Sequence, residues 1–121
     1  MVKEIMGVDF KGVADRITNG AIWDLKTCQD ASPDAFSKIV ANYKYHLQAA
    51  VYSLLTGRDD FQWLAVEKAP PYNSAVYKLA PASLVKAKAD LTKIIVDWQN
   101  WNGLPQSYSK EAELLHLPRW A

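Results

Sequence analysis

The chain of 121 residues is short of cysteine, of net charge and of long hydrophobic runs. A single cysteine, Cys28, excludes an internal disulfide and fits a reducing compartment, so we expect a cytoplasmic location. No apolar run approaches the roughly 20 residues of a membrane-spanning helix, and no signal-peptide pattern is visible. The net charge of +1 does not by itself indicate a nucleic-acid-binding protein. Because 50% of the residues are hydrophobic, we expect a single domain over residues 1–121 with a buried core.

The stretch 11–27 predicts two short strands joined by a turn at Asn19-Gly20, since Asn-Gly favours a type I′ turn with positive φ at both positions. The first strand would carry Asp15, and the second would carry Asp24 and Lys26. Side chains two residues apart point to the same face of a strand, so the second strand places a carboxylate beside an ammonium. Two aspartates and a lysine in an otherwise apolar hairpin can hold a hard cation. The alternative is an ordinary hairpin with a solvated face.

Three short patterns follow one another along the chain: GxxDR at residues 12–16, DxKT at 24–27 and QxxxY at 48–52. In this order they resemble the later motifs of the RecB-like branch of the PD-(D/E)XK nucleases. Longer stretches at 24–52 and 61–79, and the final LHLPRWA, closely resemble the C-terminal nuclease domain of RecE-type exonucleases (exonuclease VIII). The resemblance covers nearly the whole chain from residue 11 to residue 121.

The resemblance implies an α/β fold, with a PD-(D/E)XK (restriction-endonuclease-like) core of a mixed central β-sheet and flanking helices. The chain departs from the family pattern before its first aspartate, where Val13 and Ala14 replace a frequent Arg-Pro pair. Family members also bring a further acidic or histidine ligand from a helix upstream of this aspartate, and residues 1–14 offer no such helix. We therefore expect an N-terminally shortened core that binds Mg²⁺ weakly, exposes apolar residues on one face of its sheet and tends to associate.

The resemblance also implies the site and its chemistry. The metal would be Mg²⁺ or Mn²⁺, since its ligands would be oxygen atoms of Asp15, Asp24 and the Leu25 carbonyl. Lys26 would orient or deprotonate the attacking water, and Gln48 would contact DNA or orient a ligand. Support of the site or contact with DNA is expected from three further residues, namely Arg16, Thr27 and Tyr52. For Arg16, a structural pairing with a carboxylate is the favoured interpretation.

The implied activity is degradation of the 5′ strand of linear double-stranded DNA, which leaves 3′ overhangs for a single-strand annealing protein of the RecT type. The implied assembly is a ring-shaped homo-oligomer around the duplex. Two alternatives stay open. A RecB-like nuclease of other specificity would share the same motifs, and a shortened prophage-derived remnant would keep the fold and only bind DNA or assemble.

The remaining pattern predicts the other elements. Residues 1–10 predict one strand, and Ser32 with Pro33 predicts a helix start. A second helix is expected over 43–56 and ends at Gly57, with Tyr45, Gln48, Tyr52 and Leu55 on one stripe. Strands are expected at 61–68 and 75–79, the first covered on both faces, and a long helix over 81–100 stopped by Asn102-Gly103 and Pro105. The apolar tail 114–121 is expected to dock onto the body or a neighbouring subunit.

Overall fold

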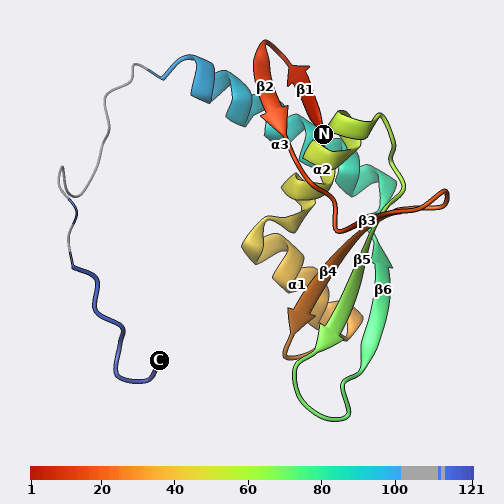
Figure 1. Cartoon of the computed structure of the whole chain (residues 1–121), viewed down its shortest axis with the longest axis vertical. Helices are drawn as coiled ribbons and strands as arrows, with labels where there is room; N and C mark the ends of the chain where they lie inside the picture. Colours follow the sequence, from red (N-terminus) through yellow and green to blue (C-terminus); the bar gives the residue numbers. More distant parts are fainter. Residues whose placement is uncertain (102–111, 113) are drawn as a thin grey trace.

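The computed structural model of the chain describes residues 1–101, 112 and 114–121 (Figure 1). A four-stranded sheet has the order β3-β4-β5-β6, and β1 and β2 form a separate hairpin. Strands β4 and β5 are parallel, while β3 and β6 pair antiparallel with them, so the sheet is mixed as expected. The elements in chain order are β1 (Val2–Ile5), β2 (Val8–Lys11), β3 (Arg16–Ile17), β4 (Ile22–Cys28), α1 (Pro33–Tyr43), α2 (Tyr45–Thr56), β5 (Phe61–Glu67), β6 (Ser74–Lys78) and α3 (Pro81–Gln99).

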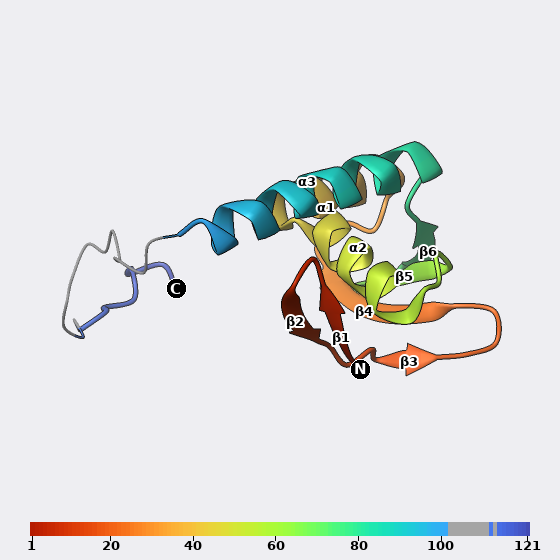
Figure 2. The same cartoon turned by 90° about the horizontal axis from the view of Figure 1, so that it is seen from above.

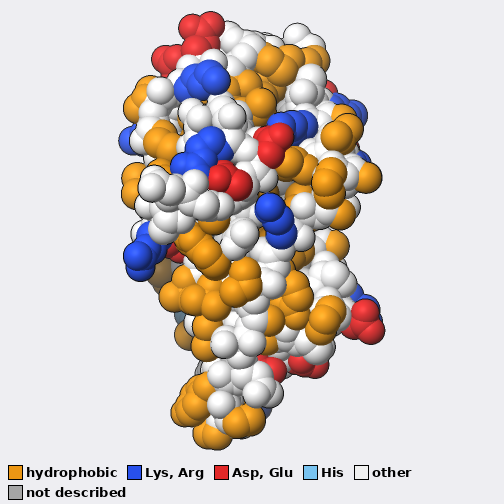
Figure 3. Space-filling model, turned by 90° about the vertical axis from the view of Figure 1, so that its right-hand side faces the viewer, with side chains coloured by type: hydrophobic (Ala, Val, Ile, Leu, Met, Phe, Trp, Pro, Cys, Tyr) orange, Lys and Arg blue, Asp and Glu red, His pale blue; other side chains and the backbone are white. Residues whose placement is uncertain are grey.

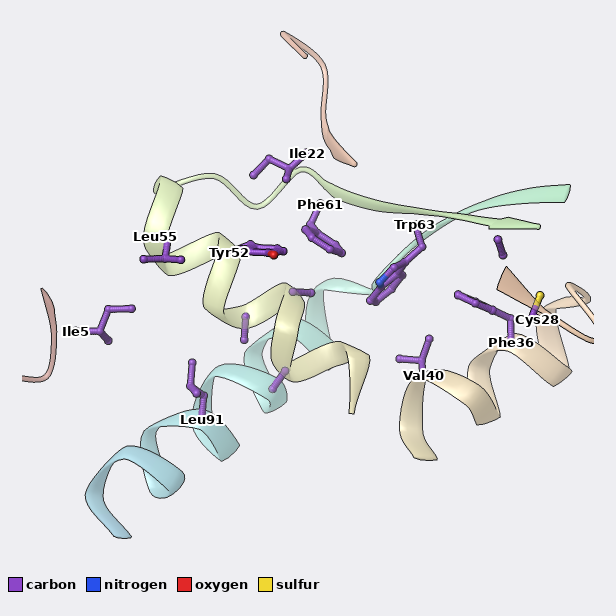
Figure 4. Close-up of a cluster of buried hydrophobic side chains, with 14 of the residues drawn as sticks. Ile5, Ile22, Cys28, Phe36, Val40, Tyr52, Leu55, Phe61, Trp63 and Leu91 are labelled. Atoms are coloured by element: carbon purple, nitrogen blue, oxygen red, sulfur yellow. The ribbon is translucent and has the colours of Figure 1, made fainter. Parts of the chain in front are cut away.

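The helices α1, α2 and α3 lie on one face of this sheet, which Figure 2 shows from above. Burial alternates along the two central strands, so that Ile22, Asp24 and Cys28 of β4 face the helices. On β5 the ring of Trp63 is buried against Phe36 of α1 and beside Phe61 (Figure 4). The core therefore lies between one face of the sheet and the helices, as the alternation of apolar side chains dictates.

No helix of the described residues covers the other face of the sheet. Leu25 of β4 and Val76 of β6 are each 53% exposed, and Leu64 between them is half-buried. The expectation that 61–68 is covered on both faces is therefore wrong, because its outward side chains find no second layer. The expectation of exposed apolar residues on one face is confirmed. Figure 3, a view from the β6 side, shows apolar side chains exposed among scattered charges rather than a broad field of one sign.

Two local predictions are wrong, and each failure has a backbone cause. Residues 1–10 form a hairpin rather than one strand, because Met6 and Gly7 both have positive φ and reverse the chain. The turn at Asn19-Gly20 is present, but neither residue has positive φ, so it is not type I′. Thr18 closes this turn instead: its backbone N–H donates to the Ala21 carbonyl at 2.9 Å, and its Oγ1 accepts the Ala21 N–H at 3.1 Å.

The helix boundaries are close to the expected ones. Ser32 is the N-cap of α1 with Pro33 in its first turn, and Gly57 ends α2 with φ 70°. The second helix begins at Tyr45 rather than at Tyr43, because Lys44 takes a left-handed conformation that ends α1. The predicted stop at Asn102-Gly103 and Pro105 lies outside the described residues. No helix of the described residues has the length and apolarity needed to cross a membrane.

The tail does not dock onto the body in this structure, where its large apolar side chains are 80–94% exposed. In Figure 1 residues 114–121 run apart from the sheet and helices. The expectation of a docked tail on the same chain is therefore not met. The exposed side chains concerned are Leu114, Leu115, Leu117 and Trp120.

Candidate active site

Strand β4 carries the two charged residues that face the helices. Asp24 is buried, with 5% of its surface exposed, and its Oδ2 lies 2.9 Å from the Nζ of Lys26. The two side chains share a face because they are two positions apart on an extended strand, as the sequence predicts. The side chain of Lys26 is 18% exposed, so this ion pair lies at the boundary between core and solvent.

Asp15 reaches the same place from the segment just before β3, not from within a strand as expected. Strand β3 pairs only with Ile22 and Trp23, so the edge of β4 beyond them has no partner strand in the described part of the chain. The carboxylate of Asp15 takes that position and accepts the backbone N–H of Leu25 at 2.9 Å. In an extended strand the N–H and C=O of one residue point to the same edge, so the Leu25 carbonyl faces the side of Asp15.

The two carboxylates influence each other. Burial raises the pKa of Asp24, the neighbouring Lys26 ammonium opposes that rise, and the negative charge of Asp15 adds to it. Two carboxylates that repel each other in a half-dry site are stabilised by a cation, whether a proton or a metal ion. The arrangement therefore favours a positively charged ligand between Asp15 and Asp24.

Helix α2 supplies the other wall. The ring centroid of Tyr45 lies 4.2 Å from the Lys26 ammonium, a cation–π contact. One turn further, the Oε1 of Gln48 is buried and has no hydrogen-bond partner among the described residues. A further turn on, the hydroxyl of Tyr52 donates to the Val13 carbonyl at 2.9 Å. The predicted stripe thus faces the motif segments, and an unpaired buried acceptor at Gln48 calls for a donor from a ligand or water.

Gly12 explains how the GxxDR segment approaches this helix. A Cβ on Gly12 would lie 2.7 Å from Cε1 of Tyr52 and 3.1 Å from Leu55. Only a residue without a side chain lets the backbone pass this close to the ring. The glycine of the first motif and the tyrosine of the third are therefore direct packing partners. This contact positions Asp15, which follows Gly12 by three residues, beside β4.

One of the expected supporting residues, Thr27, lies elsewhere, whereas Arg16 borders the site. The Thr27 side chain is exposed and alternates to the face opposite Asp24 and Lys26. Arg16 is exposed and lines a hollow of about 530 Å³ together with Asp15, Asp24 and Leu25, the residues expected to hold the metal. Within the described residues no carboxylate lies within ion-pair distance of Arg16, so its favoured pairing is not formed here. Tyr52 is brought to the site, through packing and its bond to Val13.

Sequence reasoning missed the role of Tyr45, which the helical stripe marks only as a core aromatic. Its contact with Lys26 depends on how α2 crosses β4, and no spacing within the chain encodes that crossing. Glu67, at the end of β5, accepts the backbone N–H of Ala31 at 3.0 Å. His46 lies next to Tyr45, and its Nδ1 is 3.4 Å from the Val40 carbonyl, so this histidine does not face the aspartates.

The donor set fits a small oxygen-preferring cation such as Mg²⁺ or Mn²⁺. The two carboxylates lie close together, the Leu25 carbonyl faces the side of Asp15, and oxygen donors suit these hard ions. In the described part of the chain, no cluster of three or more Asp, Glu, His or Cys side chains occurs. The described residues thus provide two charged ligands at most, and water would complete the coordination.

A mixed sheet with one central parallel pair, helices on one face, Asp24 and Lys26 on β4 and Asp15 beside that strand defines a PD-(D/E)XK-like domain. The chain belongs to the family described as "PDDEXK-like domain of unknown function (DUF3799)", whose model matches residues 1–103. No protein of curated function matches the chain.

One solved structure supports the same fold. It is described as a "Putative exonuclease" from Eubacterium rectale, with 21% sequence identity and a TM-score of 0.55. The similarity covers 78% of this chain and 42% of that protein, so the chain spans less than half of its neighbour's length. At this identity the likeness concerns the fold alone.

Proposed function

We propose that this chain is a divalent-metal-dependent DNA exonuclease of the RecE type. The observation that carries the proposal is the convergence of Asp15, Asp24 and Lys26 at the open edge of β4. The unpaired amide oxygen of Gln48 borders the same face of α2 as Tyr45, which contacts Lys26. The family supports a nuclease fold, and the name of the structural neighbour supports an exonuclease.

The residues divide the work of phosphodiester hydrolysis. Asp15, Asp24 and the Leu25 carbonyl would hold the metal ion, which would supply positive charge to the scissile phosphate and make a bound water more acidic. Lys26 orients the attacking water and offsets the charge that develops on the phosphate. The Tyr45 ring holds the Lys26 ammonium in place, and Gln48 accepts a hydrogen bond from a water or a DNA group.

The finer activity rests on the resemblance at residues 24–52 and 61–79. On this resemblance, the chain degrades the 5′ strand of linear duplex DNA and leaves 3′ overhangs. The partners in this proposal are duplex ends, a single-strand annealing protein of the RecT type and further copies of the chain arranged around the DNA. The location in this proposal is the cytoplasm.

The experiment is degradation of end-labelled linear duplex by the purified chain, with Mg²⁺, with Mn²⁺ and with chelator. Label at the 5′ end should be released as short products while label at the 3′ end stays on long strands. Asp15→Ala and Asp24→Ala should abolish release, because each removes a metal ligand rather than core volume. Gln48→Ala should lower the turnover rate clearly while it changes the melting temperature little.

Two results would overturn parts of this assignment. Cleavage at the wild-type rate by Asp24→Ala would remove the aspartates from the mechanism. Release from the 3′ end, or cleavage within circular DNA, would retain the nuclease and reject the RecE-type polarity in favour of another RecB-like specificity.

A second candidate is a DNA-binding remnant that does not cleave. It is favoured by the small donor set, since the described residues lack a third acidic or histidine side chain at the site. Weak Mg²⁺ binding would follow. Under this candidate the chain binds linear duplex in a gel-shift experiment and releases no label at any Mg²⁺ or Mn²⁺ concentration.

A further inference from the structure

Two tyrosines form an aromatic step beside the catalytic lysine. The rings of Tyr43 and Tyr45 are stacked, with centroids 5.7 Å apart and an interplanar angle of 22°. Tyr45 is half-buried, whereas Tyr43 is 70% exposed. The outer ring therefore presents one face to its neighbour and leaves most of its surface to solvent.

This stack depends on an unusual backbone. In a continuous helix, side chains two positions apart point in different directions and do not meet. Lys44 lies between the tyrosines with φ 60° and ψ 33°, a left-handed conformation that is unfavourable for a residue other than glycine or asparagine. It ends α1 at Tyr43 and begins α2 at Tyr45. Strained backbone at a junction beside a charged site is typical of positions kept for function.

The stack continues the line of contacts from the buried aspartate to the surface. Asp24 pairs with Lys26, the Lys26 ammonium lies 4.2 Å from the centre of the Tyr45 ring, and Tyr45 stacks on Tyr43. The exposed ring is thus two contacts away from the lysine that acts on the scissile phosphate. A DNA strand whose phosphate reaches Lys26 has its neighbouring nucleotides within reach of this ring.

We propose that Tyr43 is a stacking platform for an unpaired nucleobase next to the scissile phosphate. This inference rests on the proposed nuclease function. An exposed aromatic ring stacks on any base, which suits an enzyme that does not read sequence. A base inside a duplex already has two stacked neighbours, so the ring can take only a base at a frayed or single-stranded end. The specificity is therefore for DNA ends whose terminal nucleotides are unpaired.

The test measures binding of the protein, in buffer with Mg²⁺, to two DNAs, one blunt duplex and one duplex with four unpaired nucleotides at each end. The fluorescent base 2-aminopurine replaces the terminal unpaired base. All proteins carry Asp24→Asn so that the DNA is not cut. The variants are Tyr43→Leu, Tyr43→Phe and Tyr43→Trp. Tyr72→Leu is the matched control, because Tyr72 is 58% exposed on the β5–β6 loop and no described ring stacks on it.

Tyr43→Leu should weaken binding to the unpaired ends about 5- to 100-fold and remove the quenching of 2-aminopurine. Binding to blunt duplex should change less than about twofold, and Tyr72→Leu should change neither. Tyr43→Phe should retain both properties, and Tyr43→Trp should bind unpaired ends more tightly, a gain that misfolding cannot produce.

Three outcomes would overturn the inference. Unchanged binding in Tyr43→Leu, or equal losses on both DNAs, rejects base stacking while the nuclease assignment stands. Loss of self-association in Tyr43→Leu with no effect on DNA would assign the ring to a protein contact instead. Absence of DNA binding by both the Asp24→Asn parent and the wild-type protein would reject the stacking platform and the proposed function together, and only this outcome affects both.

Discussion

The backbone at Gly12 passes so close to the ring of Tyr52 that a methyl group on the glycine would lie 2.7 Å from Cε1. The same tyrosine donates its hydroxyl proton to the carbonyl of Val13. Two sequence motifs that lie 36 residues apart, GxxDR and QxxxY, are therefore one packing unit. This packing holds the segment that carries Asp15 in the position where the Asp15 carboxylate accepts the backbone N–H of Leu25.

Gly12→Ala should lower both stability and cleavage. The new methyl group must push the segment off the Tyr52 ring, and overpacking of this kind costs about 1–3 kcal/mol in the free energy of unfolding. Asp15 would shift with it, so the metal site should weaken. Gly20→Ala is the matched control, because no atom lies within 4 Å of the added Cβ, and its change should stay within about 0.5 kcal/mol. Urea unfolding and label release measure the two effects. Equal behaviour of the two variants would reject the packing argument.

Tyr45 should act through Lys26. Lys26→Ala removes the ammonium and should slow the single-turnover rate by about 10² or more if it acts in proton transfer. Tyr45→Leu retains an apolar side chain but loses the ring face 4.2 Å from the ammonium, so it should slow the same step by a smaller factor. Tyr45→Phe keeps the ring and should leave the rate unchanged. In the Lys26→Ala background Tyr45→Leu should have no further effect, and additive losses would separate Tyr45 from the lysine.

Asp24→Asn should raise the stability of the metal-free chain at neutral pH. Burial raises the pKa of Asp24, so the folded state binds its proton more tightly than the unfolded state does. The charged carboxylate therefore destabilises the fold above that pKa, and the wild type recovers as the pH falls through it. The advantage of Asp24→Asn should shrink from pH 7 to pH 4 in urea unfolding.

Asp59→Asn is the control with the opposite sign. Hydrogen bonds from Ser53 and Lys88 lower the pKa of Asp59 in the folded chain. The charged carboxylate therefore stabilises the fold at pH values above the pKa that Asp59 has in the unfolded chain, and this contribution is lost as the pH falls through the folded-state pKa. This variant should be less stable than the wild type at pH 7.

For Asp24, equal stability of the wild type and Asp24→Asn at both pH 7 and pH 4 would contradict the claim that the Asp24 charge destabilises the fold.

The sequence predicted the parts of the fold that depend on local pattern. Turn and capping chemistry predicts the β5–β6 hairpin, the start of α1 at Ser32 and Pro33, and the end of α2 at Gly57. The shared face of Asp24 and Lys26 follows from the two-residue period of a strand. These features need no knowledge of how distant elements pack.

Features set by distant packing were not predictable from the residues. Lys44 is not a residue type that favours positive φ, so nothing local places the break between α1 and α2 at Lys44 rather than before Tyr43. Nor does the nearly continuous apolar sequence of β5 reveal that only one face of this strand meets helices. The contact of Tyr45 with Lys26 and the steric need for Gly12 both arise where α2 crosses β4 and the segment before β3. Such crossings depend on tertiary packing.

The uncovered face of the sheet should drive self-association. Leu25, Leu64 and Val76 are register partners across β4, β5 and β6, so they form one apolar row on that face. Val76→Lys places a charge at the exposed end of this row, and burial of an unpaired charge in an interface is strongly unfavourable.

In sedimentation experiments, Val76→Lys should weaken association of the chain at least about tenfold. Val85→Lys adds the same charge on α3, where Val85 is 68% exposed and lies on no strand of this row, and should leave association unchanged. Folding should be retained in both variants, because each side chain is already mostly exposed. A wild-type chain that sediments as a monomer at all concentrations, or equal effects of the two lysines, would show that this face does not mediate association.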